Sequence, residues 1–207
     1  MIKVSALTVK KLQEGVFEDN LPEFYQLKDV IENNAWHNND VVFTHVLKVL
    51  EKLEEILTQV GAKINSYLAQ KVDRNTRRDL LYLATVFHDI AKPETIEEKE
   101  GTTLCPGHEK AGAIKVQPIL DTFNLSKKEQ GLVTKIIEHH SIVHEILGLE
   151  MDELHRQLAD FKQRFFDIYL ELVLLGMADT SGSQLQENNP KEFLTRLDLY
   201  RKVLEEY

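Results

Sequence analysis

Residues 80–93 read LLYLATVFHDIAKP, an apolar run that ends in an adjacent histidine and aspartate, followed at once by Ile90, Ala91, Lys92 and Pro93. The apolar part has the length and composition of a buried helix. Moving an imidazole and a carboxylate out of water costs free energy unless they are hydrogen-bonded, ion-paired or bound to a metal. His88 and Asp89 therefore need partners from elsewhere in the chain.

The composition is that of an ordinary globular domain. With 207 residues the chain is long enough for one sizeable core, so we expect a single domain over residues 1–207. The 34 acidic and 25 basic residues give a net charge of −9, which disfavours nonspecific binding to nucleic acid. A small anionic substrate would need local positive charge, and a bound cation can supply it.

Cysteine content and hydropathy indicate the environment of the protein. Cys105 is the only cysteine, which excludes an intramolecular disulfide and a thiolate zinc cluster, and we interpret it as an incidental loop residue. The longest apolar stretch, residues 165–178, contains Asp167 and Glu171 and is shorter than the roughly 20 residues that span a bilayer. The N-terminal sequence lacks the order of a secretory signal. We expect a cytoplasmic protein without membrane contact.

Apolar residues recur at helical spacing through most of the chain, and no alternating strand pattern stands out. An N-terminal arm or short helix is expected over residues 1–20, and a loop over residues 91–107. Helices are expected over residues 22–32, 40–60, 62–70, 74–90, 108–123, 127–139, 151–161, 164–178 and 190–207. This pattern predicts an all-α protein, a bundle of roughly six to nine helices.

Side chains that can bind a metal lie on or just beyond the apolar faces of three expected helices. They are His45, His88, Asp89 and Asp179. His45 shares a helix face with Val49 and Leu53, so its side chain should point inward. Asp179 directly follows the most apolar helix, where a carboxylate needs a cation or several donors to stay ionised. Two imidazoles and two carboxylates suit a hard to borderline divalent ion with open positions for water and substrate.

A structural interpretation of the same pattern is open at this point. A single inward-facing histidine is more often a hydrogen-bonded core residue than a metal ligand, and paired core histidines could stabilise a bundle with no other role. A set of four such residues on three core helices favours the metal site.

The order His45, His88-Asp89, Asp179 resembles the H…HD…D signature of the HD-domain metal-dependent phosphohydrolases. The segments HDIAKPET, LCPGHEKAGA, IIEHH and MADTSGS are similar to the HD domain of bacterial CCA-adding enzymes and poly(A) polymerase relatives. The resemblance covers residues 36–184, and Ala91 stands where glycine is common in the family. No nucleotidyltransferase head precedes it in this sequence, so we do not expect nucleotide addition to RNA ends.

The resemblance implies an HD-type helical bundle and a set of metal ligands. It makes His45, His88, Asp89 and Asp179 ligands of a first divalent ion, which could be Mn, Ni, Fe, Co or Mg. In two-metal members further histidines bind a second ion. The matching candidates here are His108 with either His139 or His140, and His144 as a further candidate if the helix continues. His108 is otherwise a surface histidine at a helix start.

Further residues are implied in catalysis. Lys92 matches the family's basic residue after the HD pair, where it could hold a phosphate oxygen; otherwise it is a solvated loop lysine. Asp89 could serve as both ligand and proton acceptor, and Glu109 or a second-site histidine as general base or acid.

The expected function is divalent-metal-dependent hydrolysis of a phosphomonoester or phosphodiester, with a metal-activated water as the attacking group. The expected partner is a small phosphorylated, nucleotide-like substrate. The alternative is an HD-fold module that binds a nucleotide, an RNA end or a protein partner with metal but without turnover, because a fold does not fix a function.

Overall fold

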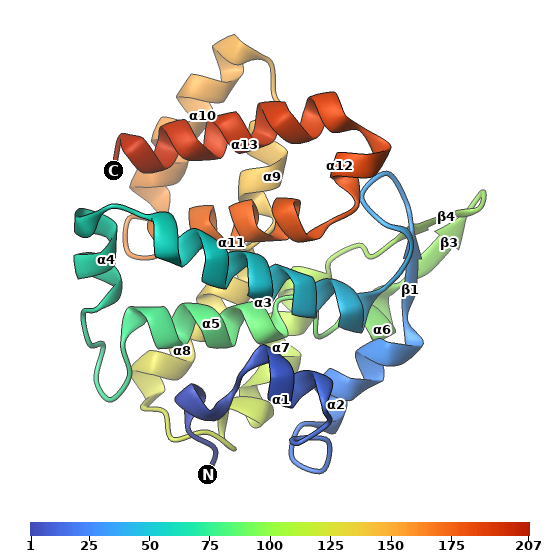
Figure 1. Cartoon of the computed structure of the whole chain (residues 1–207), viewed down its shortest axis with the longest axis vertical. Helices are drawn as coiled ribbons and strands as arrows, with labels where there is room; N and C mark the ends of the chain where they lie inside the picture. Colours follow the sequence, from blue (N-terminus) through green and yellow to red (C-terminus); the bar gives the residue numbers. More distant parts are fainter.

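The computed structural model describes residues 1–207, except for the side chain of Met151. The core is built around α3 (Val42–Gln59), α5 (Arg77–Phe87) and α11 (Tyr169–Gly182). Helix α11 packs against α3 and against α13 (Pro190–Glu205), and α5 packs against α8 (Lys127–His139), which in turn contacts α7 (His108–Leu120). Figure 1 shows α3 and α5 running side by side. The protein is mostly helical, as the sequence predicts.

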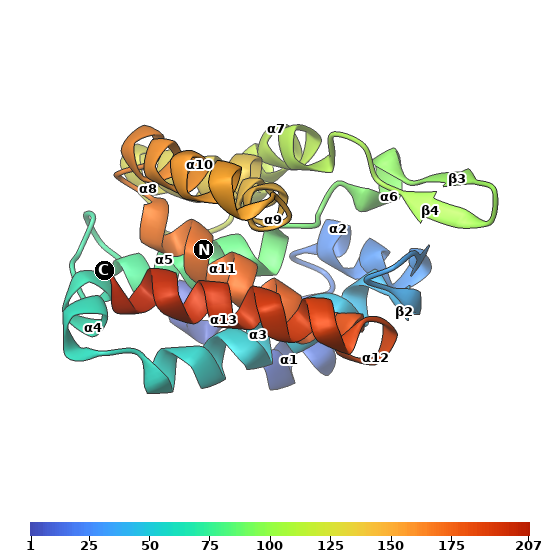
Figure 2. The same ribbon diagram turned by 90° about the horizontal axis from the view of Figure 1, so that it is seen from above.

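The remaining helices are short or peripheral. They are η1 (Val4–Ala6), α1 (Val9–Gln13), α2 (Pro22–Tyr25), η2 (Gln26–Asp29), α4 (Ala62–Leu68), α6 (Lys92–Thr95), α9 (Ile142–Leu147), α10 (Met151–Arg164) and α12 (Leu185–Asn188). In Figure 2, α7, α8, α9 and α10 form a layer on the side of α5 opposite α3. The N-terminal segment contributes Val4, Leu7 and Leu12 to the core, so it is not a projecting arm.

Helix α11 is the central helix of the bundle. Its residues are buried almost all the way round, because they are nearly all apolar or small. It also lies very close to α3: a Cβ added at Gly182 would stand 2.8 Å from the backbone nitrogen of Val49. The sequence predicted that this helix ends before Asp179. It continues to Gly182, so Asp179 projects from a regular helix that is fixed against α3.

Two short hairpins were not predicted. The expected helix over residues 22–32 was wrong beyond Asp29, because β1 (Ile31–Asn33) pairs there with β2 (Asn38–Val41). The expected loop over residues 91–107 contains α6 and a hairpin of β3 (Glu97–Lys99) with β4 (Thr102–Leu104). Glu100 and Gly101 both have positive φ, 54° and 77°, as a two-residue type I′ turn requires. Strands of three or four residues are too short to show an alternation of apolar and polar residues in the sequence.

The two hairpins contact each other at one side of the bundle. The backbone N–H of Asn33 donates to the Thr103 hydroxyl at 2.7 Å, and the Asn33 amide donates to the carbonyl of Gly101 at 3.0 Å. Figure 1 shows them together at the end of α3 where that helix begins. We refer to β1–β2 and β3–β4 as the hairpin pair.

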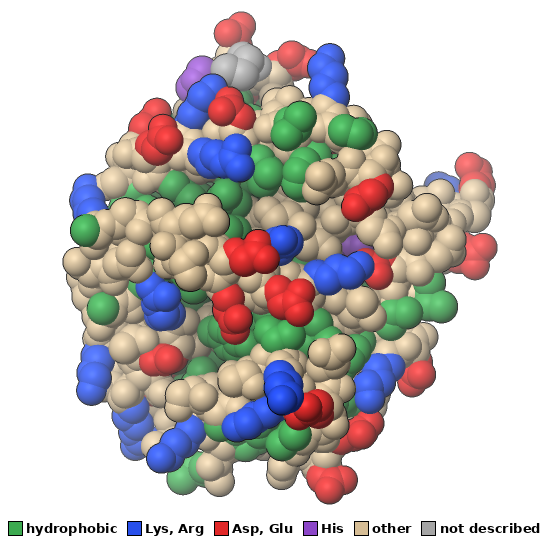
Figure 3. All heavy atoms as spheres, viewed as in Figure 1, with side chains coloured by type: hydrophobic (Ala, Val, Ile, Leu, Met, Phe, Trp, Pro, Cys, Tyr) green, Lys and Arg blue, Asp and Glu red, His purple; other side chains and the backbone are tan. Residues whose placement is uncertain are grey.

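Charged side chains are scattered over the outer surface (Figure 3). Figure 3 shows acidic side chains gathered near the middle of one face, over α3, whose exposed residues include Glu51, Glu54 and Glu55. Among the described residues, no helix has both the length and the apolar character needed to cross a bilayer.

Candidate metal centre

The ends of several helices bring the sequence-predicted residues together. His45 lies in the first turns of α3, His88 directly follows α5, and Asp179 projects from α11. Each of these three side chains offers a ligand atom, and the three atoms lie within 4.8 Å of one another. His45 Nε2 is 2.9 Å from Asp179 Oδ1. The structure thus brings positions 45, 88 and 179 together in one donor group. Their role as metal ligands stays a prediction.

A second donor group lies beside the first. It consists of Asp89, His108 at the start of α7, and His140 directly after α8, again with ligand atoms within 4.8 Å of one another. His108 Nε2 is 3.5 Å from Asp89 Oδ1, and His140 Nε2 is 3.9 Å from the same oxygen.

Asp89 stands between the two groups. While its Oδ1 faces His108 and His140, its Oδ2 is 3.3 Å from His88 Nε2 and 3.8 Å from His45 Nε2. One carboxylate therefore presents one oxygen to each group of imidazoles, so Asp89 could contribute a ligand oxygen to a divalent ion held in either group.

The ring orientation of three histidines is fixed in the same way. In each, Nδ1 lies within hydrogen-bonding distance of the backbone carbonyl three residues earlier: His88 to Thr85 at 2.8 Å, His108 to Cys105 at 2.7 Å and His140 to Ile137 at 2.7 Å. A carbonyl can only accept, so Nδ1 carries the proton and the Nε2 lone pair is free. Such partners orient metal-binding histidines.

These lone pairs fit a divalent cation. His108 Nε2 and His140 Nε2 are only 3.3 Å apart, and two acceptor nitrogens at that distance repel each other unless a positive charge lies near both. His88 Nε2 is buried without a well-formed hydrogen bond. A mixed nitrogen and oxygen donor set without thiolate suits metals such as Mn, Fe, Co or Ni.

Neighbouring charges and hydrogen bonds keep the carboxylates of Asp89 and Asp179 ionised. Burial alone would raise the pKa of Asp89, but the neighbouring His88 and Lys92 outweigh it and hold that pKa well below its ordinary value. Burial likewise opposes ionisation of Asp179, and hydrogen bonds from His144 and His45 outweigh it and lower the pKa of Asp179.

Burial also affects the imidazoles. It is the main cause that lowers the pKa of His140 well below its ordinary value, and the nearby His88 and His108 add to the effect. His140 is therefore neutral near pH 7, which is the form that binds metals. For His88, burial would lower the pKa, but the adjacent Asp89 carboxylate outweighs it and raises the pKa.

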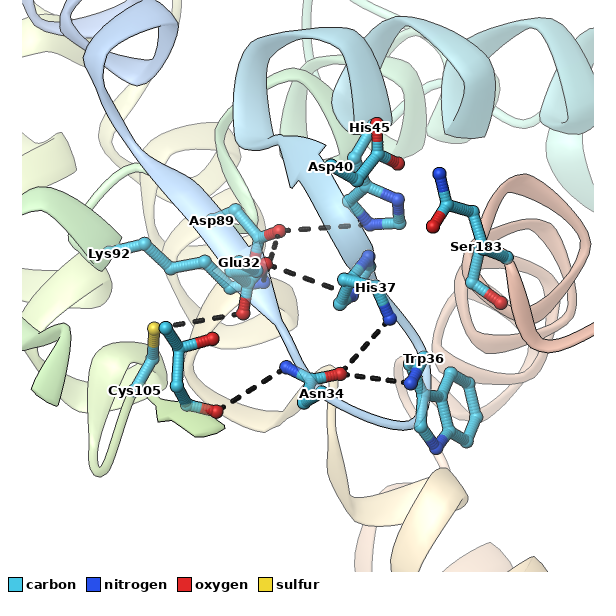
Figure 4. Close-up of polar contacts among 12 residues, drawn as sticks. Glu32, Asn34, Trp36, His37, Asp40, His45, Asp89, Lys92, Cys105 and Ser183 are labelled. Carbon is cyan, nitrogen blue, oxygen red and sulfur yellow. Dashed lines mark hydrogen bonds and ion pairs between the residues drawn. The ribbon is translucent and has the colours of Figure 1, made fainter. Parts of the chain in front are cut away.

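Lys92 lies between two carboxylates. Its Nζ is 2.7 Å from Glu32 Oε2 and 2.9 Å from Asp89 Oδ2, and Figure 4 shows its side chain extending between them. Although burial opposes it, these two carboxylates raise the pKa of Lys92, which stays protonated. Lys92 is buried and not a solvated loop lysine. Phosphate binding by Lys92 stays a prediction. A phosphate would have to compete with the carboxylates of Glu32 and Asp89 for the Lys92 ammonium group.

The structure separates the neighbouring histidines of the IIEHH segment. His140 faces the donor group, whereas His139 packs against Phe165 with ring centroids 4.7 Å apart, and its Nε2 is 3.9 Å from Glu138 Oε2. His144, on α9, lies with Nε2 at 2.9 Å from Asp179 Oδ2, beside the first group and not the second. The sequence left this choice open.

Two other candidates lie near the second group. Glu109 Oε2 is 3.6 Å from His108 Nδ1, on the side of that ring away from Asp89. Cys105 lies 3.7 Å from Glu32, and burial, with this carboxylate, raises the pKa of the thiol to about 12. The thiol is therefore protonated near pH 7, in agreement with its interpretation as an incidental residue.

Sequence reasoning missed Glu32 and His37, which the β1–β2 hairpin brings to the site. The His37 ring lies 4.5 Å from the His45 ring, and its Nε2 is 3.7 Å from Glu32 Oε2. Burial, together with His45 and Lys92, lowers the pKa of His37 to about 3. The sequence signal available for His37 was its place in the polar run before α3.

Comparisons with known proteins agree with this geometry. The HD domain family matches residues 42–179. A bifunctional uridylyltransferase/uridylyl-removing enzyme from Pasteurella multocida is 26% identical over 129 residues, which are 62% of this chain and 14% of the relative. One from Hydrogenovibrio crunogenus is 26% identical over 184 residues, 86% of this chain and 19% of the relative.

The chain thus spans less than a fifth of the length of these curated relatives. The matches support an HD domain with distant homology to uridylyl-removing enzymes, and they do not single out the CCA-adding enzymes that the sequence motifs resemble. The family match covers most of the chain, from the start of α3 to Asp179, and includes every residue of the H…HD…D signature. With its histidines and aspartates gathered in buried or partly buried donor groups, this chain belongs to the HD domain family.

Proposed function

We propose that this protein hydrolyses a phosphoester, using one or two divalent ions held by the two donor groups. The observation that carries the proposal is the placement of Asp89, one oxygen toward His88 and the other toward His108. A divalent ion in such a site lowers the pKa of water and stabilises the negative charge that develops on phosphate oxygens.

The protein residues contribute positioning and charge. His88, His108 and His140 aim Nε2 inward because their Nδ1 protons are bound to carbonyls. Lys92 supplies a fixed positive charge next to Asp89. Glu109, whose Oε2 is 3.6 Å from His108 Nδ1, remains the proposed proton acceptor or donor.

The partly exposed residues indicate where a substrate reaches the site. The side chains of Asp179, His144 and His108 keep 15%, 15% and 14% of their surface exposed, whereas His45, His88 and Asp89 are almost completely buried. We infer that a phosphate group approaches along the edge formed by α7, α9 and α11.

Nucleotidyl phosphodiesters are the proposed substrate class. The relatives are named for removing a uridylyl group, which is a nucleotide joined through a phosphodiester. The motif resemblance to the HD domains of CCA-adding enzymes also favours a nucleotide-like substrate. Phosphomonoesters are the second class to test.

The test uses protein purified without a histidine tag and loaded with Mn, Ni, Co or Mg. Release of p-nitrophenol is measured from its phosphomonoester and from its uridine 5′-phosphodiester. We expect turnover that Asp89→Ala abolishes, while Asp121→Ala, at an exposed aspartate, keeps the wild-type rate.

Equal rates for Asp89→Ala and wild type would refute the assignment. Tight nucleotide binding without hydrolysis under any of the metals would favour a binding module. Less than about a tenth of an equivalent of bound divalent ion would favour a purely structural bundle.

A further inference from the structure

Both oxygens of Asp179 are engaged, each by a different histidine. Oδ1 is 2.9 Å from His45 Nε2, inside the first donor group, and Oδ2 is 2.9 Å from His144 Nε2, on its outer side. His144 is not part of either donor group described above. It lies outside the first donor group and contacts Oδ2 of Asp179, the oxygen that is not paired with His45.

His144 is held in turn by Tyr200 of α13. The Tyr200 hydroxyl is 3.1 Å from His144 Nδ1, and the Tyr200 side chain is completely buried. A carboxylate can only accept, so in a neutral imidazole the proton is on Nε2, and Nδ1 must accept from the Tyr200 hydroxyl. The three side chains form a chain of hydrogen bonds from α13 through α9 to α11.

Other contacts fix the same histidine. Arg196 donates to the backbone carbonyl of His144 at 2.9 Å, and the Trp36 and His144 rings pack in a T-shaped arrangement with centroids 5.1 Å apart. Gly176 of α11 makes room for this packing, because a Cβ there would be 2.6 Å from the Tyr200 hydroxyl. His144 is therefore anchored through both its ring and its backbone.

We propose that His144 and Tyr200 are positioning residues that orient Asp179 for metal binding, an inference that rests on Asp179 being a ligand in the proposed function. A free carboxylate can rotate and present either oxygen. A donor on Oδ2 fixes the plane of the carboxylate and keeps Oδ1 directed at His45, inside the first donor group, where it could bind a divalent ion. Loss of such outer hydrogen-bond partners lowers metal affinity by about 10- to 100-fold.

The test measures Mn²⁺ binding by isothermal titration calorimetry, which needs no substrate. Tyr200→Phe keeps the aromatic ring and removes only the hydroxyl, and we expect it to raise the Kd by about 10-fold. Tyr25→Phe is the matched control, because the Tyr25 hydroxyl also makes a buried hydrogen bond, to the Leu12 carbonyl at 3.0 Å, in a different part of the core. Its Kd should equal that of the wild type.

Variants of His144 separate positioning from packing. His144→Gln keeps a side-chain N–H that can donate to Asp179, so we expect it to recover most of the affinity that His144→Ala loses. Thermal unfolding without metal reports any folding defect of the alanine variant. The Kd of Tyr200→Phe can be interpreted whether or not His144→Ala folds normally.

The outcomes distinguish the two proposals. Wild-type Kd values in both Tyr200→Phe and His144→Ala would overturn the positioning role while leaving the phosphohydrolase proposal intact. A wild-type protein that binds no divalent ion would overturn both.

Discussion

Lys92 and Glu32 form an ion pair inside the protein, with 2.7 Å between Nζ and Oε2 and with side-chain exposures of 7% and 5%. The same ammonium group is 2.9 Å from Asp89 Oδ2. The β1–β2 hairpin thus supplies a negative charge that allows a lysine to stay protonated beside a proposed metal ligand.

Lys92→Met should strongly destabilise the protein, because it leaves Glu32 and Asp89 buried without their shared cation. Breaking a buried ion pair typically costs about 3–5 kcal/mol. Urea unfolding at pH 7 measures the loss. The control is Lys52→Met, which removes an exposed pair of 2.8 Å with Glu55 and should cost about 1 kcal/mol or less. Similar losses in both variants would contradict the prediction.

His140→Ala and His139→Ala should differ in metal content, although the residues are adjacent. Only His140 belongs to the second donor group, whereas His139 packs against Phe165. Elemental analysis after Mn²⁺ loading should show less metal per chain in His140→Ala and an unchanged amount in His139→Ala. If His139→Ala were the variant that loses metal, the assignment of the pair would be reversed.

Gly182→Ala should disturb the contact between α11 and α3. The added Cβ would meet backbone atoms of Val49 at 2.8 Å and 3.0 Å, and backbone cannot move aside as a flexible side chain can. We expect a loss of about 1–3 kcal/mol and weaker Mn²⁺ binding, since the contact also sets the distance between His45 and Asp179.

Gly131→Ala in α8 is the matched control, because its Cβ would meet nothing within 4 Å. In a helix interior this change should stabilise by about 0.5–1 kcal/mol. Denaturant unfolding of the two variants provides the test. Equal stability of Gly182→Ala and the wild type would show that α11 can shift without cost.

Ionisation of Glu171 should lower the free energy of unfolding as pH rises, because its carboxyl group is buried. Its carboxylate is 2.7 Å from Arg77 Nε and 3.1 Å from the Tyr67 hydroxyl, but burial outweighs these contacts and raises the pKa of Glu171 above its ordinary 4.5. Between the two pKa values the folded state binds more protons than the unfolded state. The free energy of unfolding contributed by Glu171 therefore falls as pH rises through this window and is constant above it.

Glu171→Gln cannot ionise and lacks this dependence. Relative to it, the wild type should lose stability as pH rises from about 4.5, in urea unfolding curves taken at several pH values. Titration of the metal-site residues is common to both proteins and cancels in the difference. A wild type that instead gains stability relative to Glu171→Gln would mean that the Arg77 pair outweighs burial.

Helix periodicity explains how much of the structure was predictable. The expected helix over residues 127–139 coincides with α8, where Ser126 and Glu129 form a reciprocal cap. The inward direction of His45 follows from local spacing on one helix face, and the place of Asp179 beside the core follows from its position directly after the most apolar run. These features depend on residues a few positions apart, so sequence alone contains them.

The parts that were not predictable depend on distant contacts. Glu32 meets Lys92 across 60 positions, through a hairpin whose strands are too short to show an alternating pattern. The choice between His139 and His140 depends on where α8 ends and on the packing of Phe165. Neither relationship has a local signal.

The hairpin pair also has a consequence for the order of folding. The hydrogen bond from Asn33 to Thr103 joins residues 70 positions apart, so a long segment must lose its freedom before the contact forms. The turns of α3 and α5 depend on near neighbours and can form earlier. The hairpins then close over a preformed helical frame, and in native-state hydrogen exchange the Asn33 amide should become labelled before the amides in the middle of α11.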